Sequence, residues 1–223
     1  MVQRMPPRRC RAVIFDLDGT LIDSLDDIAG ALGGALEDAG LPMPARDDVQ
    51  AWVGDGARNL CARAVSAAGG TPELFEIVHA KFAARYRAMP IHHTKLYPGI
   101  AAMLDELTSR GCALGVLSNK PHDLTMTITE KLLGVWPFAA IAGQRPGIPL
   151  KPDPEAAMAM AMELGVEPHD CVLVGDSPMD LGCARGAEMR AIGVTWGLRP
   201  RDELVGADHL IDKPSDLLAL TES

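Results

Sequence analysis

The stretch VIFDLDGTLIDS, residues 13–24, decides how the rest of the chain is interpreted. The apolar run RAVIF at 11–15 predicts a buried strand, and two carboxylates one residue apart, Asp16 and Asp18, follow it directly. An Asp-Gly turn accounts for only one of them. A second carboxylate at the end of a buried strand therefore indicates chemistry as well as a turn.

The chain changes character after this stretch. Segments 24–40, 46–54, 57–70 and 72–89 carry apolar residues at helical spacing, whereas apolar strands and helices alternate from about residue 100 onward. Such alternation predicts a parallel sheet that is covered on both faces. We expect an α/β fold, namely a Rossmann-like core of residues 1–20 and 95–223 with helices on both faces. An all-helical cap would be inserted at 21–94, joined by hinge connections near 21–23 and 91–96.

Three local features carry further expectations. Ser24 precedes the first cap helix and suits its N-cap. Met158, Met160 and Met162 alternate with alanines in a helix and are expected to pack in the core. The start, MVQRMPPRRCR, is basic without an apolar centre, which predicts a loose tail and no secretory signal.

Composition excludes several function classes. A net charge of −9 over 223 residues argues against general nucleic-acid binding, and no apolar run is long enough for a membrane span. The five cysteines are scattered without a CxxC pair, so disulfides and a zinc site are not expected. Together these features predict a cytoplasmic protein.

Polar groups follow four of the predicted strands. Ligands bind beyond the carboxyl ends of the strands in open parallel sheets, so these groups would gather at one edge. They are Asp16 and Asp18 after the first strand, Ser118, Asn119 and Lys120 after the second, Lys151 after a loop that follows the third, and Asp176 and Asp180 after the fourth.

Four carboxylates at one edge require cations. Two such charges ~4 Å apart repel by about 4 kcal/mol at an effective dielectric constant of 20. Lys151 supplies one positive charge, and a divalent cation would supply two more. Oxygen ligands with no His or Cys, together with a substrate phosphate, suit Mg²⁺. Backbone amides would add to the binding of phosphate.

The four motifs DLDGT, SN, KP and GDSPMD, in this order and in these strand contexts, resemble those of the haloacid dehalogenase superfamily. The resemblance spans nearly the whole chain, including the position of the cap. Within the superfamily, the chain is most similar to bacterial phosphoglycolate phosphatase-like proteins, on LIDS, VGDGARNL, LYPGI, SNKP, GQRPGIPLKPDP and GADHLID.

The resemblance implies roles for the strand-end residues. Asp16 would attack phosphorus and form an aspartyl-phosphate, and Asp18 would act as general acid and base. Ser118 and Asn119 would bind the phosphoryl oxygens, and Lys151 would neutralise the nucleophile and the transferring group. Gly19 would let the backbone approach the phosphate, while Thr20 would either orient the loop or fill a turn position.

The resemblance also implies a metal site and a substrate site. Asp16, Asp176 and the backbone carbonyl of Asp18 would hold Mg²⁺, and Asp180 would bind a water of the outer shell or pair with Lys151. In the cap, Gly54 and Arg58 match the specificity loop. Arg58 would bind a substrate carboxylate or be an ordinary surface arginine, and Lys120 and Arg145 are alternative substrate-binding residues.

The sequence therefore predicts a Mg²⁺-dependent phosphatase of small phosphate monoesters, with 2-phosphoglycolate favoured. Its partner would be a small phosphorylated metabolite. A pyrophosphatase or a sugar-phosphate phosphatase on the same site remains open, as does a non-catalytic phosphate-binding protein. Monomer and homodimer are both compatible with the sequence.

Overall fold

The computed structural model describes residues 10–221, so residues 1–9 of the predicted N-terminal tail lie outside the described residues. The last two residues of that tail are not loose, because Cys10 is buried in the core and the Arg11 N–H donates to the Asp170 carbonyl. Within the described chain, six strands form one parallel sheet in the order β5-β4-β1-β6-β7-β8. Their bounds are β1 Ala12–Phe15, β4 Ala113–Pro121, β5 Phe138–Gln144, β6 Cys171–Gly175, β7 Arg190–Val194 and β8 His209–Ile211. The chain runs from β1 outward through β4 and β5, then crosses to β6 on the other side of β1, so the switch point of the sheet lies at β1.

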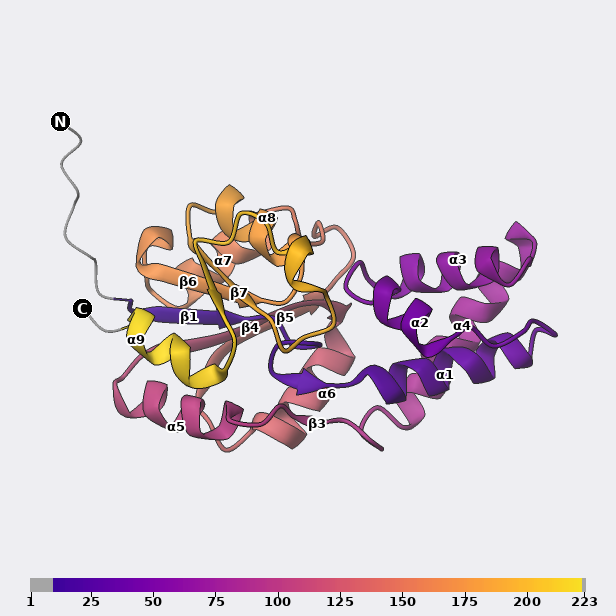
Figure 1. Cartoon of the computed structure of the whole chain (residues 1–223), viewed down its shortest axis with the longest axis horizontal. Coiled ribbons are helices and arrows are strands. Elements are labelled where there is room, and N and C mark those ends of the chain that lie inside the picture. Colours follow the sequence, from indigo (N-terminus) through magenta and orange to yellow (C-terminus); the bar gives the residue numbers. More distant parts are fainter. Residues whose placement is uncertain (1–9, 222–223) are drawn as a thin grey trace.

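Helices cover both faces of the sheet (Figure 1). Successive residues of a strand point to opposite faces. Val13 and Phe15 of β1 therefore join one core cluster, while Ala12 and Ile14 join the other. Helices α5 (Ile100–Ser109), α6 (His122–Leu133) and α9 (Leu217–Thr221) pack on the first face, and α7 (Glu155–Glu163) and α8 (Pro178–Gly186) on the second. The predicted Rossmann-like parallel core is confirmed.

The methionines of α7 correct one prediction. Met160 is 2% exposed and packs against the sheet, whereas Met158 and Met162 are 46% and 80% exposed. Residues two apart on a helix are separated by about 200° around its axis, so Met160 faces the sheet while Met158 and Met162 share the opposite face. The expectation that all three pack in the core was wrong.

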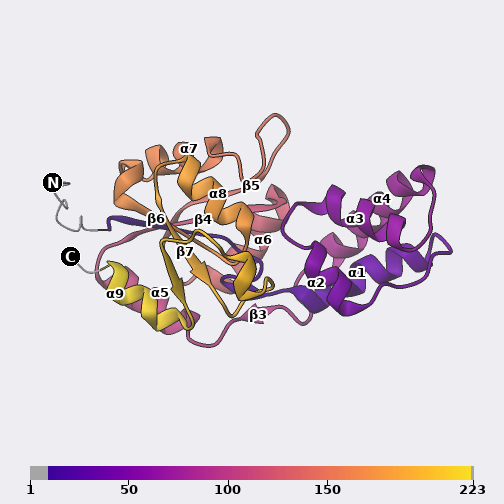
Figure 2. The same cartoon turned by 45° about the horizontal axis from the view of Figure 1, so that its top comes forward.

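Four helices form a separate unit at one end of the sheet, as Figures 1 and 2 show. They are α1 (Leu25–Glu37), α2 (Arg46–Trp52), α3 (Ala57–Ala67) and α4 (Pro72–Ala88), and they enclose a hydrophobic cluster of their own. Leu124 and Leu198 of the α/β core also belong to this cluster. We refer to α1–α4 as the cap, and the boundaries 21–94 given above remain a prediction.

Two short strands, β2 (Ile22–Asp23) and β3 (Lys95–Leu96), pair antiparallel where the chain leaves and re-enters the core. Next to them, the buried Asp27 of α1 ties the second connection to the cap. Its carboxylate accepts the backbone N–H groups of His92, His93 and Thr94 at 2.9–3.0 Å and the Thr94 hydroxyl at 2.6 Å. The two predicted hinge segments are therefore fastened to each other and to α1.

Short 3₁₀ helices at Pro168–Asp170, Arg201–Glu203 and Pro214–Asp216 complete the described elements. No described helix is long and apolar enough to cross a membrane. The described cysteines are free thiols.

Candidate active site

The nucleophile candidate Asp16 lies directly after β1 and is held by a buried lysine. Lys151 Nζ donates to Asp16 Oδ1 at 2.7 Å, to Asp180 Oδ1 at 2.6 Å and to the Leu117 carbonyl at 2.8 Å. Burial alone would lower the pKa of Lys151, but the charges of Asp16 and Asp180 raise it above its ordinary value. The ammonium therefore stays charged and holds Asp16 in place.

Asp176, at the end of β6, is held between two glycines. A Cβ atom at Gly19 would lie 2.3 Å from Asp176 Oδ2, and one at Gly197 would lie 2.3 Å from Asp176 Cβ. The Leu198 N–H donates to Oδ2 at 2.7 Å, and Thr20 Oγ1 contacts Oδ1 at 3.3 Å. Gly19 has a φ of 85°, a conformation in which only glycine is unstrained. The DGT turn thus contacts Asp176 through Gly19 and Thr20, while the role of Thr20 stays a prediction.

Asp180 is fully buried, and both of its oxygens have partners. Oδ1 accepts from Lys151, while Oδ2 accepts the Ser177 N–H at 3.1 Å and its hydroxyl at 2.6 Å. The bond to the Ser177 N–H caps the start of α8. Asp180 therefore pairs with Lys151, one of its two predicted roles, and it orients the lysine rather than offering a vacant oxygen.

Asp18 faces the cap and has different partners. Ser24 Oγ donates to Asp18 Oδ1 at 2.5 Å, and Lys120 Nζ lies 2.9 Å from Oδ2. Ser24 occupies the N-cap position of α1, as predicted, but its hydroxyl is directed to Asp18. Lys120 also donates to the Tyr86 hydroxyl of α4 at 2.7 Å, which joins the cap to the carboxylate.

The site carries a deficit of positive charge. Four carboxylates and two ammonium groups leave a formal charge of −2 in a buried region. Burial, against the opposing charge of Lys151, raises the pKa of Asp16 to about 7. Burial and the charge of Asp16 raise the pKa of Asp176 to about 8. Both carboxylates would bind a proton readily unless a cation replaces it.

This donor set fits a divalent cation. Oxygens of Asp16, Asp176 and Asp180 lie within 4.8 Å of one another, all three residues are buried, and no His or Cys joins the group. Hard oxygen donors favour Mg²⁺, and its two charges would balance the deficit. Asp16 and Asp176 are the carboxylates best placed to hold it, because both line the cavity described below, whereas Asp180 is not among its described lining residues.

The predicted site residues of the second strand lie within β4, near its carboxyl end, and line the cavity described below. Ser118 Oγ accepts the Lys120 N–H at 3.3 Å, which leaves the hydroxyl proton to donate into the cavity. The Asn119 side chain instead donates to the carbonyls of Gly54 and Lys151 at 3.0 Å each and accepts the Lys151 N–H at 2.8 Å. Asn119 thus links the cap loop to the lysine loop, and its binding of a phosphoryl oxygen stays a prediction.

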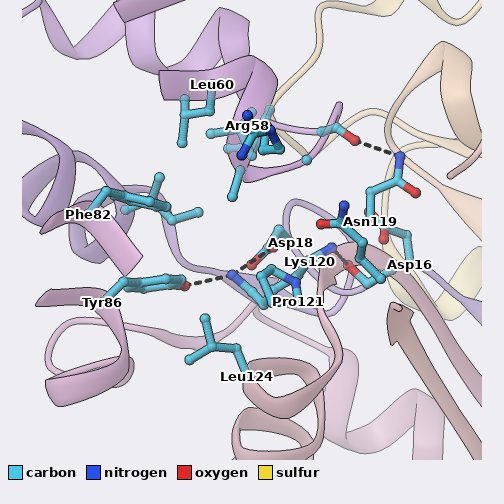
Figure 3. Close-up of a pocket in the computed structure, with 18 of the residues that line it drawn as sticks. Asp16, Asp18, Arg58, Leu60, Phe82, Tyr86, Asn119, Lys120, Pro121 and Leu124 are labelled. Carbon is cyan, nitrogen blue, oxygen red and sulfur yellow. Dashed lines mark hydrogen bonds and ion pairs between the residues drawn. The ribbon is translucent and has the colours of Figure 1, made fainter. Parts of the chain in front are cut away.

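A cavity of about 230 Å³ lies between the cap and these residues. Asp16, Asp18, Ser118 and Asp176 line its floor, and Figure 3 shows several of the groups around it. Its other walls are largely apolar, formed by Ile28, Val53, Leu60, Phe82, Ala83, Leu124 and Leu198.

The two arginines predicted as substrate ligands are placed differently. Arg58 lines the cavity, but its guanidinium pairs with Glu76 at 2.6 Å and lies 4.6 Å from the Phe75 ring centroid. Arg145 is exposed, contacts the ring of His122 and is not among the described residues that line the cavity. Gly54 lines the cavity as predicted for the specificity loop, and its carbonyl accepts from Asn119.

Sequence reasoning missed the loop after β7 and the tyrosine of the cap. Leu198 and Arg199 follow a parallel strand at the same edge as the other motifs, so the strand-end argument applies to them equally. Arg199 donates to the carbonyls of Ala51 and Val53 in the cap. No motif marks Tyr86, whose position depends on the packing of α4.

Comparison with known proteins agrees with this geometry. The family model of haloacid dehalogenase-like hydrolases matches residues 13–194. A phosphoglycolate phosphatase of Xanthomonas campestris pv. campestris (strain 8004) is 32% identical over 210 residues, which cover 93% of this chain and 94% of that protein.

Two solved structures have the same fold. One, described as a predicted phosphoglycolate phosphatase from Haemophilus somnus 129PT, has a TM-score of 0.86 at 28% identity and covers 95% of this chain and 98% of its own. The other is CbbY from Rhodobacter sphaeroides in complex with phosphate, with a TM-score of 0.81 at 25% identity over 95% of this chain and 99% of its own.

Proposed function

This chain belongs to the haloacid dehalogenase-like hydrolase family and is a phosphoric monoester hydrolase, and from that premise we propose that it is a Mg²⁺-dependent phosphatase of 2-phosphoglycolate. The observation that carries the proposal is the meeting of Asp16, Asp18 and Asp176 on the floor of one cavity, with Lys151 bound to Asp16. The names of the relatives favour the substrate. A cytoplasmic location is part of the same proposal.

In the proposed reaction, Asp16 attacks the phosphorus atom, and the bond between phosphorus and the leaving oxygen breaks. An aspartyl-phosphate forms, so one difficult hydrolysis becomes two easier steps. The Lys151 ammonium donates a hydrogen bond to Asp16 and would stabilise negative charge on the phosphoryl oxygens. The Ser118 hydroxyl would donate to one of these oxygens.

In this proposal Asp18 acts first as the general acid and then as the general base. It would donate a proton to the departing oxygen and then take one from the water that attacks the aspartyl-phosphate. Its carboxylate is fixed by Ser24 on one oxygen and by Lys120 on the other, so its position on the cap side of Asp16 is defined. This side is where the leaving group must lie, because the nucleophile approaches from the opposite direction in an in-line displacement.

When bound at Asp16 and Asp176, Mg²⁺ would supply charge neutralisation for the phosphoryl group and orient it toward the nucleophile. The protein's own contribution is to hold the ligands in place. Gly19 and Gly197 enclose Asp176, and the Leu198 N–H fixes one of its oxygens. The apolar walls of the cap exclude water, which strengthens each of these electrostatic interactions.

The cavity ranks the alternative substrates. A sugar phosphate carries several hydroxyl groups that would need hydrogen-bond partners, but the walls beyond Asp18 are mostly apolar. Pyrophosphate would place a second, more highly charged phosphate beside Asp18, where Lys120 is the described cation in direct contact. A small leaving group with one charged substituent suits the cavity better. A non-catalytic protein is disfavoured because Asp16, Asp18, Lys151 and Asp176 are all present and in contact range of one site.

A kinetic comparison tests the proposal. The purified protein should hydrolyse 2-phosphoglycolate with Mg²⁺ and lose at least about 10³-fold in kcat on Asp16→Asn substitution, while circular dichroism shows an unchanged fold. Asp47→Asn, on the exposed surface of α2, provides a matched control. Retention of most activity by Asp16→Asn would exclude the covalent mechanism. Faster hydrolysis of sugar phosphates or pyrophosphate than of 2-phosphoglycolate would refute the substrate assignment.

A further inference from the structure

Lys120 and Tyr86 meet on the cavity wall next to Asp18, although they come from β4 and α4 (Figure 3). Both side chains are buried: Lys120 is 7% exposed and Tyr86 is 2% exposed. The ammonium lies 2.9 Å from Asp18 Oδ2 and 2.7 Å from the Tyr86 oxygen, and it lies over the Tyr86 ring at 4.4 Å from the centroid. Burying a lysine in an apolar wall is costly, so this placement calls for a reason.

The hydrogen-bonding capacity of the pair is only partly used. An ammonium has three N–H donors, and the contacts with Asp18 and Tyr86 use two of them. The Tyr86 oxygen accepts from Lys120, so its own proton is available as a donor. Burial, with a smaller opposing effect of Lys120, raises the pKa of Tyr86 to about 12, and the phenol therefore keeps that proton at neutral pH. One N–H and one O–H can thus donate to an anion in the cavity.

The location of the pair matches one part of the substrate. The phosphoryl group must lie at Asp16, and the leaving oxygen must lie within reach of Asp18. A substituent one carbon beyond that oxygen would then lie near Lys120, which is in direct contact with Asp18. In 2-phosphoglycolate that substituent is a carboxylate.

The other cations around the cavity are engaged elsewhere. Arg58 pairs with Glu76, and Arg87 pairs with Asp123 at 2.6 Å. Arg199 is directed to two cap carbonyls. His79 has a pKa lowered by burial and by Arg58, so it is neutral at pH 7. Lys120 is therefore the described cation best placed to neutralise an anion beside Asp18.

We propose that Lys120 and Tyr86 form a subsite for a carboxylate on the leaving group and thereby determine the substrate specificity. The proposal rests on the phosphatase function proposed above and assigns the carboxylate to this pair instead of Arg58. Because Tyr86 belongs to the cap and Lys120 to the core, the subsite is complete only when the cap packs against the end of the core as it does here.

The test compares 2-phosphoglycolate with phosphoglycolamide, in which a neutral amide replaces the carboxylate. Tyr86→Phe keeps the ring that stacks on Phe82 at 5.7 Å and removes only the hydroxyl. It should lower the ratio of kcat/KM for the two substrates about tenfold, and Lys120→Met should lower it further. Tyr97→Phe changes the chain's other tyrosine, which is not among the described cavity residues, and should keep the wild-type ratio.

A merely structural role would give a different result. If Lys120 and Tyr86 only position Asp18, the variants lose kcat equally on both substrates and the ratio stays within twofold, which overturns the proposal. Efficient hydrolysis of both substrates by the wild type, without preference, would also overturn it while leaving the phosphatase function intact.

Binding provides a readout that does not depend on turnover. In an Asp16→Asn background, adding Tyr86→Phe should weaken calorimetric binding of 2-phosphoglycolate about tenfold and that of inorganic phosphate less than twofold. Equal weakening of the binding of both ligands would contradict the subsite, whether or not the protein hydrolyses the esters. Absence of hydrolysis of both esters would by itself refute only the proposed function.

Discussion

Substitution of Asp27 by Asn tests the fastening of the hinge. In the native structure one carboxylate oxygen, Oδ2, accepts three backbone N–H groups and the Thr94 hydroxyl, and the other accepts the His93 N–H. Asparagine has nearly the same shape and can keep an oxygen at the crowded position, but it has no charge. The variant therefore isolates what the charge contributes.

The magnitude follows from the number of bonds. A hydrogen bond to a charged group contributes about 1.5–3 kcal/mol, against about 0.5–1.5 kcal/mol for a neutral pair. Four bonds to one oxygen are not additive, and halving the summed difference gives a loss of about 2 kcal/mol. For a chain of this size such a loss lowers Tm by roughly 4–8 °C. Asp26→Asn is the control, because Asp26 forms an exposed ion pair with Arg46 that contributes about 0–1 kcal/mol.

The effect also has a defined pH dependence. Burial raises the pKa of Asp27, but the bonds from the Thr94 hydroxyl and the three N–H groups outweigh burial, so the pKa in the folded state lies below the ordinary value of 3.8. Such a group contributes stability above its unfolded-state pKa and loses it as the pH falls through the folded-state value. The difference between wild type and Asp27→Asn should thus be full at pH 7 and shrink below pH 3.8.

Urea unfolding followed by circular dichroism measures both effects. The reasoning fails if Asp27→Asn and Asp26→Asn are equally stable at pH 7 within about 0.5 kcal/mol, which is near the resolution of such comparisons. It also fails if the stability difference persists unchanged well below the lowered pKa, because the charge could not then be its source.

Two further predictions concern the site. Gly197→Ala should raise the Mg²⁺ concentration needed for half-maximal activity at least about fivefold and lower the stability by about 1–3 kcal/mol. The reason is that the alanine Cβ would lie 2.3 Å from Asp176 Cβ and 2.4 Å from the Gly19 carbonyl oxygen. Gly30→Ala in α1 has open space and should leave the Mg²⁺ requirement unchanged; the same requirement in both variants would show that Gly197 does not position Asp176. Removing divalent ions with EDTA should abolish activity. The Mg²⁺ concentration needed for half-maximal activity should fall as the pH rises from 6 to 8. The reason is that Asp16 and Asp176, with pKa values of about 7 and about 8, release the protons that compete with the cation. A Mg²⁺ requirement that is constant over this range, in titrations of initial rate against Mg²⁺, would exclude this competition.

The fold was predictable because its signals are local. Each strand of the parallel sheet is a short apolar run, and each helix of the cap repeats apolar residues every three or four positions, so periodicity alone separates the two regions. The methionines of α7 show the limit of such reasoning. All three occur in a helical segment, but only the angle around the axis determines that Met160 faces the sheet while Met162 lies in solvent.

The reactive residues were predictable for a second reason. They follow parallel strands, and the carboxyl ends of such strands meet at one edge whatever the loops do. The hydrogen-bond partners of the side chains at these strand ends were not predictable. Asn119 lies next to Ser118 near the end of β4, yet its amide is bound to the Gly54 and Lys151 carbonyls. That choice depends on the approach of the cap loop, a contact between segments that are 65 residues apart.

The charge of the site depends on a contact of the same kind. With Lys151 alone, four carboxylates and a divalent cation leave one negative charge uncompensated. Lys120 removes that excess, but only because β4 directs its ammonium toward Asp18, and the sequence does not state where a flexible lysine side chain ends.

The position of Tyr86 explains why specificity is harder to predict than chemistry. Val78, Phe82 and Tyr86 recur every four residues and form the buried face of α4, so the sequence indicates that the tyrosine points inward. Its apolar ring belongs to the cap cluster, while its hydroxyl extends past that cluster to a lysine of the core. An inward-facing tyrosine is ordinary in a helix bundle, and it becomes a substrate ligand only through the placement of the cap on the sheet. Residues that act on phosphorus are fixed within the core, whereas residues that select the leaving group depend on how two separately packed units meet.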